Sequence, residues 1–156
     1  MTSRGLLLSA LAALLVVLQF NLVLGISNGI YIISGPLGQL ADSGTVVTVL
    51  PEQQDAPRWK VEEMSNGFVY ISNPESGKYL SYHDPHDEAR IILDVDPKEW
   101  QLRQGQEPNS YKIVAPGGPV DGFELAIDVS RILIFPPLAA LRSYEYAQPW
   151  SFVSQE

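Results

Sequence analysis

The densest group of side chains that could do chemistry lies in residues 83–90, HDPHDEAR. The group combines two imidazoles with three carboxylates, from His83, Asp84, His86, Asp87 and Glu88. Such a set suits a metal site or an acid/base pair. Pro85 lies inside the segment and prevents a helix, which would place both histidines on one face. The sequence also gives no sign of a third metal ligand elsewhere. We therefore predict neither a metal site nor a catalytic centre here.

Other catalytic signatures are missing from the sequence. It contains no cysteine, which excludes disulfides, thiolate metal ligands and cysteine nucleophiles. We find no glycine-rich phosphate loop and no nucleophile elbow. The sequence thus predicts a protein that is not an enzyme and that uses no cofactor.

The charge of the chain argues against one class of partner. It carries 10 basic and 18 acidic residues, a formal net charge of -8. A nucleic-acid-binding protein needs a basic stripe that matches the phosphates, and this composition cannot supply one. We therefore predict that nucleic acid is not a partner.

The first 25 residues have the pattern of a secretory signal. One cation, Arg4, precedes an apolar run from Leu6 to Leu18. A membrane anchor is the alternative, but Gln19 and Asn21 interrupt the run and no cationic stop follows. We predict a signal peptide over residues 1–25, a secreted domain over residues 26–156, and no stable membrane anchor after cleavage. Removal of Arg4 with the signal changes the net charge from -8 to -9.

Residues 26–156 contain an internal repeat, and the repeat predicts where the strands lie. Three turn dipeptides feed β-rich runs, NGIYII at Asn28, NGFVYI at Asn66 and NSYKIV at Asn109. Each run is followed by a second short segment, LGQLAD, GKYLSY or ELAIDVS, and by a third, TVVTVLP, RIILDVDP or RILIFPP. A tryptophan segment ends each unit. These segments predict three units of four strands.

Twelve strands in three fourfold units predict an all-β fold, the β-trefoil, in which six strands close a barrel and three hairpins cap one end. Trp59, Trp100 and Trp150 are the only tryptophans, and each is followed two residues later by an apolar residue. That alternation is typical of half-buried strands. We expect the three rings to occupy equivalent places in the core.

The segments NGIYII, GKYLSY, RILIFPPL and QPWSF resemble the mushroom β-trefoil serine protease inhibitors of basidiomycete fungi, and the resemblance extends from Asn28 to Phe152. Membership would imply an inhibitor that presents a surface loop to a trypsin-like or related serine protease, without cofactor and without chemistry of its own. An inhibitor of cysteine proteases with the same fold is a further alternative.

Inhibition requires a loop that is held rigid before it docks. The turn Asp42-Ser43-Gly44 is one candidate, and an ordinary hairpin turn is its alternative reading. A second is residues 136–144, PPLAALRSY, whose Arg142-Ser143 bond suits trypsin-like enzymes. Residues 51–58 and 83–90 are two further proline-containing loops.

Carbohydrate binding is the main alternative function, because one fold serves many functions. Gln148-Pro149-Trp150 is similar to the Gln-x-Trp signature of ricin-like lectins, whereas Arg58 and Glu99 directly precede the other two tryptophans. A sugar site also needs an exposed aromatic ring beside polar acceptors, and no unit shows the whole set. Glycans therefore stand beside serine proteases as possible partners.

Overall fold

The structure is a computed structural model that describes residues 25–156, in which all regular structure is β. The predicted signal of residues 1–25 lies, except for Gly25, outside the described residues. Within residues 25–156 no helix is long and apolar enough to cross a membrane. The strands are β1 (Gly29–Gly35), β2 (Gly38–Asp42), β3 (Val47–Leu50), β4 (Trp59–Glu63), β5 (Val69–Ser72), β6 (Tyr79–Ser81), β7 (Ile92–Asp94), β8 (Gln101–Gln104), β9 (Ser110–Val114), β10 (Leu125–Val129), β11 (Ala139–Ser143) and β12 (Trp150–Ser154).

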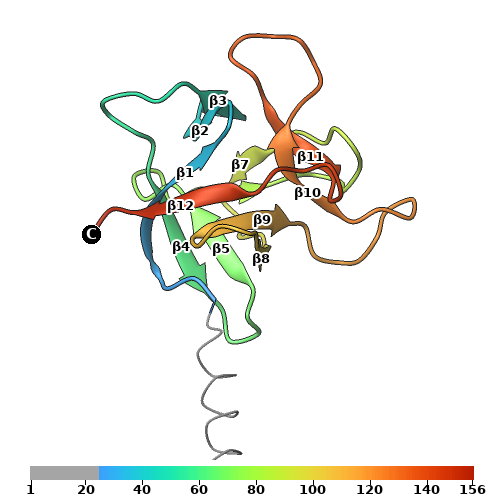
Figure 1. The fold of residues 1–156 in the computed structure, drawn as a ribbon, viewed down its shortest axis with the longest axis horizontal. Helices are drawn as coiled ribbons and strands as arrows, with labels where there is room; N and C mark the ends of the chain where they lie inside the picture. Colours follow the sequence, from blue (N-terminus) through green and yellow to red (C-terminus); the bar gives the residue numbers. More distant parts are fainter. Residues whose placement is uncertain (1–24) are drawn as a thin grey trace, which may run out of the picture.

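Six of the strands close into a barrel (Figure 1). β12 pairs with β1, β1 with β4 and β4 with β5, while β12 also pairs with β9 and β9 with β8, all antiparallel. The ring is completed between β5 and β8 by one residue pair, Val69 and Trp100, whose backbone N–H groups each donate to the other's carbonyl at 2.9 Å. This closure is slight, because Trp100 directly precedes β8 and β8 itself pairs only with β9.

The other six strands form three hairpins, β2–β3, β6–β7 and β10–β11, that meet at one end of the barrel. Single bridges link each hairpin to the next: Val46 with Ile92, Thr48 with Leu138, and Arg90 with Ala140. This barrel with a three-hairpin cap is the architecture that the repeat predicts.

The three tryptophans confirm the register of the repeat. Each ring is almost fully buried, and each indole N–H donates to a backbone carbonyl of its own unit's hairpin. Trp59 donates to Leu40 at 3.0 Å, Trp100 to Leu80 at 3.0 Å, and Trp150 to Ile127 at 2.9 Å. The three acceptors therefore mark equivalent positions in the three units.

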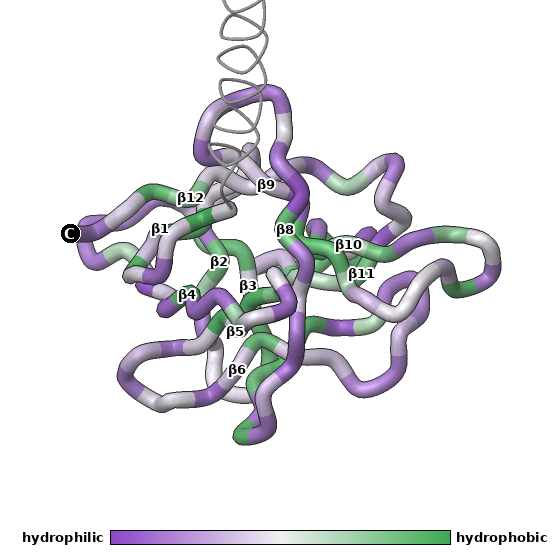
Figure 2. Tube along the Cα trace, turned by 90° about the horizontal axis from the view of Figure 1, so that it is seen from below, coloured by the Kyte–Doolittle hydropathy of each residue, from purple (hydrophilic) through white to green (hydrophobic). Residues whose placement is uncertain are grey.

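One main apolar core fills the barrel and the space under the cap, and Val114, Ala126 and Ala147 form a second, small cluster. The main core is built from alternate strand residues, which point to the inside because side chains alternate along a strand. Figure 2 shows hydrophobic residues along the strands and hydrophilic residues in most loops. The largest fully buried side chains are Ile33, Leu40, Trp59, Ile71, Leu80, Ile91, Trp100, Ile113, Ile127, Leu141, Trp150 and Phe152.

The third unit differs from the sequence prediction. Residues 131–137, RILIFPP, were expected to be its third strand, but they form a loop, and β11 begins at Ala139. Pro136 and Pro137 have no backbone N–H to give to a ladder, so pairing cannot run through them. The small side chains of β11 are buried instead, whereas Ile132 to Phe135 are exposed.

Candidate functional site

The first inhibitory candidate, Asp42-Ser43-Gly44, lies at the tip of the β2–β3 hairpin as predicted. The Gly44 N–H donates to Asp42 Oδ1 at 2.7 Å, and the Ser43 N–H donates to the carbonyl of Val46 at 3.0 Å. The Ser43 hydroxyl also lies 2.6 Å from the hydroxyl of Thr48. The turn is thus exposed and held by three local hydrogen bonds.

The second candidate, Arg142-Ser143, lies in a different setting from the predicted loop. Both residues belong to β11, where Arg142 pairs with Ala126 of β10. The Arg142 side chain is only 15% exposed, and its Nε lies 3.2 Å from Asp87 Oδ1 and 3.4 Å from Glu88 Oε1. The expectation of a long loop over residues 136–144 was therefore wrong, and the two candidates lie on different hairpins of the cap.

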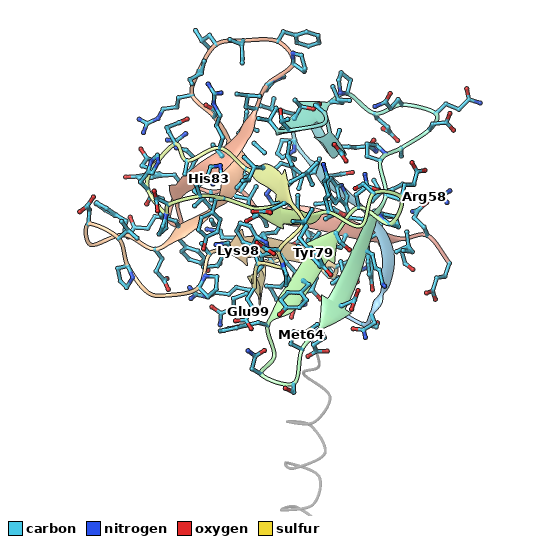
Figure 3. All side chains as sticks on the ribbon, turned by 180° about the vertical axis from the view of Figure 1, so that it is seen from behind. Arg58, Met64, Tyr79, His83, Lys98 and Glu99 are labelled. Atoms are coloured by element: carbon cyan, nitrogen blue, oxygen red, sulfur yellow. The ribbon has the colours of Figure 1, made fainter. Side chains whose placement is uncertain are left out.

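The histidine-rich loop, residues 83–90, lines an open hollow of about 690 Å³ (Figure 3 labels His83). Two of its three acidic residues, Asp87 and Glu88, already have partners. Asp87 pairs with Arg131 at 2.7 Å, and Glu88 accepts from the Ser130 hydroxyl at 2.5 Å. Across residues 25–156, no three histidine or acidic side chains are grouped so that they could hold a metal ion.

A smaller hollow, of about 290 Å³, lies beside Trp150 in the third unit. The turn between β1 and β2 forms one wall, the end of β10 a second, and the segment before β12 a third. We call it the third-unit hollow. Its lining residues are Gly35, Pro36, Leu37, Asp128, Val129, Ser130, Gln148 and Trp150.

Asp128 and Gln148 distinguish this hollow from the corresponding places in the other units. Asp128 follows the tryptophan acceptor Ile127, a position that Ala41 and Ser81 occupy in the first and second units. Gln148 stands two residues before its tryptophan, where the other units have Pro57 and Lys98 (Lys98 is labelled in Figure 3). The other two units fold without a carboxyl and an amide at these places. The fold therefore does not require this pair.

The carboxyl of Asp128 is also electrostatically unusual. Burial raises the pKa of Asp128 above its ordinary value, against the opposing effects of backbone hydrogen bonds from Val129 and Gln148 and of the Arg142 charge. Carboxylates whose pKa is raised by burial concentrate at functional sites. Sequence reasoning flagged Gln148 but missed Asp128. Aligning ELAIDVS with GKYLSY and LGQLAD in the register of the tryptophan acceptors would have found it.

Comparison with known proteins bears on the fold. No protein-family model and no curated protein sequence matches the chain. Solved structures match it over most of its length, among them the following three. The ricin B-like lectin of Macrolepiota procera, solved with lactose, has a TM-score of 0.70, 19% identity, and coverage of 83% of this chain and 99% of its own. The Rhizoctonia solani agglutinin has a TM-score of 0.69, 14% identity, and coverage of 85% and 99%. The designed threefold-symmetric protein ThreeFoil has a TM-score of 0.67, 19% identity, and coverage of 81% and 99%.

The chain is a β-trefoil. At these identities the likeness extends to the fold alone, so membership of the mushroom inhibitor family stays a prediction. The function of this β-trefoil has to be argued from its sites.

Proposed function

We propose that this β-trefoil binds carbohydrate in the third-unit hollow. The observation that carries the proposal is that Asp128 and Gln148 line one hollow in the only unit that has a carboxyl and an amide at these positions. The shared fold with a lectin solved with lactose supports it. The proposal assigns no catalysis to the domain.

The chemistry of the hollow suits a neutral, hydroxyl-rich ligand. Ionised Asp128 accepts hydrogen bonds from sugar hydroxyls, and the Gln148 amide can both donate and accept. Leu37, whose side chain is 64% exposed, and Pro36 provide an apolar wall for the C–H face of a sugar ring. The Ser130 hydroxyl already donates to Glu88, so its proton is not available to a sugar.

We expect Asp128→Ala to weaken binding about tenfold or more, the usual effect of losing a hydrogen bond to a charged group. A glycan array with the domain and titration with lactose measure the effect. Asp42→Ala is the matched control, because it removes a carboxyl of the same kind from the first unit. Equal affinity of Asp128→Ala and the unaltered domain would place the sugar site elsewhere.

A pH series gives a second control on the same residue. Because the pKa of folded Asp128 is raised, its carboxylate is lost on acidification at a higher pH than the value of about 4 typical of aspartate. Lactose affinity should fall through that higher range, and the residual affinity of Asp128→Asn should stay flat there. A midpoint at or below the ordinary value would contradict the assignment.

Serine protease inhibition is a second proposed function, favoured by the rigid, exposed turn at Ser43. Holding a loop in place before docking lowers the entropy lost on binding. If the turn enters the cleft of a serine protease, Ser43→Glu should raise the inhibition constant about tenfold or more. The same change at Ser76, in the exposed turn between β5 and β6, is the control. Trypsin, chymotrypsin, elastase and papain make up the panel. Papain tests the cysteine protease alternative, and inhibition unchanged by Ser43→Glu would exclude this turn.

A further inference from the structure

The loop between β10 and β11 carries the longest run of consecutive exposed apolar residues in the described domain. Its tip is four consecutive apolar residues: Ile132 is 47% exposed, Leu133 100%, Ile134 48% and Phe135 83%. In Figure 1 the loop rises well above its hairpin. Apolar residues gathered in this way usually mark an interaction site.

The base of the loop is fixed, although its tip is exposed. Glu88 accepts hydrogen bonds from the Ser130 hydroxyl at 2.5 Å and from the Arg131 N–H at 2.9 Å. The Arg131 guanidinium lies 2.7 Å from Asp87. These contacts tie the loop to residues 83–90. The tip is therefore presented in a defined direction, and little entropy is lost when it binds.

The backbone of the loop is partly paired within the protein. Residues 131–137 have five N–H donors, because Pro136 and Pro137 have none. Three of these donors have acceptors: Arg131 donates to Glu88, Ile132 to the Ser130 hydroxyl at 3.1 Å, and Ile134 to the carbonyl of Ile132 at 3.0 Å. An unsatisfied N–H is costly in hydrocarbon, so internal pairing lowers the cost of transfer into lipid.

We propose that this tip inserts into the surface of a neutral phospholipid bilayer. All four side chains are exposed, with Leu133 fully so, whereas a protein groove would cover only one face of such a tip. Lipid tails can surround the tip on every side. The net charge of -8 disfavours anionic lipid. The proposal uses none of the residues that line the third-unit hollow except Ser130, and it stands independently of carbohydrate binding.

Flotation with phosphatidylcholine vesicles tests the proposal on residues 26–156, which include every strand and the whole described core. Leaving out residues 1–25 ensures that their apolar run cannot contribute. We expect the domain to float with the vesicles, and Leu133→Glu and Phe135→Glu each to reduce the bound fraction about tenfold or more, since each removes one buried apolar side chain and adds a charge. Val95→Glu, at a side chain 72% exposed after β7, should change nothing.

Any of the following results would overturn the proposal. The first is no flotation of a domain whose unfolding transition is intact. The second is equal loss of flotation in Val95→Glu and the loop variants. The third is vesicle binding that strengthens when phosphatidylserine is added, because that would assign the contact to charge. If the loop variants instead abolish a dimer in size-exclusion chromatography or inhibition of a panel protease, the occupant of the tip is a protein.

Discussion

Replacing Trp59, Trp100 or Trp150 by alanine is expected to destabilise the domain by about 3–5 kcal/mol in each case, the usual cost of truncating a large aromatic in a packed core. All three rings are buried to 2% exposure or less. Each variant also removes the indole donor to Leu40, Leu80 or Ile127. Equilibrium unfolding in denaturant measures the effect.

Tryptophan to phenylalanine separates the two contributions, because it keeps most of the apolar ring and deletes the donor. The net loss of one buried hydrogen bond corresponds to about 1 kcal/mol, so the phenylalanine variants should lie well above the alanine variants in stability. Similar losses at the three positions are expected from their equivalent contacts. A loss below about 1 kcal/mol at two of the three positions would show that the rings do not support the core.

Gly38→Ala is expected to destabilise the domain by about 3 kcal/mol or more. Gly38 begins β2 with a φ of +144°, and an added Cβ would lie 2.2 Å from the carbonyl oxygen of Leu50 and 2.7 Å from its carbon. Those atoms are backbone and cannot turn away, so backbone strain and overpacking add to each other. The measurement is again the free energy of unfolding.

Gly44→Ala is the control for this change. Gly44 also has a positive φ, of +98°, but nothing lies within 4 Å of an added Cβ. The only cost there is that alanine disfavours a positive φ, which should lower the free energy of unfolding by about 1–2 kcal/mol. If Gly38→Ala cost no more than Gly44→Ala, β2 and β3 would have to separate easily at this point.

The fold could be predicted because its determinants are local and repeated. Turn dipeptides at Asn28, Asn66 and Asn109 and an equivalent tryptophan in each unit identify three similar units, and three similar four-strand units have few ways to pack. The prediction failed in the third unit, where the β-branched run 131–137 looked more like a strand than the small residues Ala139 and Ala140 do. The segment that became the strand is the one whose side chains are buried, and which side chains are buried depends on the whole fold.

The candidate site was harder to predict than the fold. Asp128 and Gln148 lie 20 positions apart in the sequence, and only the register of the third unit brings both to one hollow. The sequence predicts Arg142 as an inhibitory residue because trypsin cleaves after arginine. In the structure the Arg142 guanidinium instead forms ion pairs with Asp87 and Glu88. Those acidic residues belong to the second unit, so the sequence around Arg142 gives no indication that they lie beside it.

The barrel closes unevenly, and that feature has a mechanical consequence. One residue pair joins β5 to β8, whereas four pairs join β1 to β12 and four join β4 to β5. Local opening of a protein follows the line where the fewest contacts have to break. The β5–β8 seam is such a line, and the continuous ladder from β5 through β4, β1 and β12 to β9 can act as its hinge. Breaking the two mutual hydrogen bonds of Val69 and Trp100 would therefore open the barrel along the β5–β8 seam, while the other barrel strands stay paired.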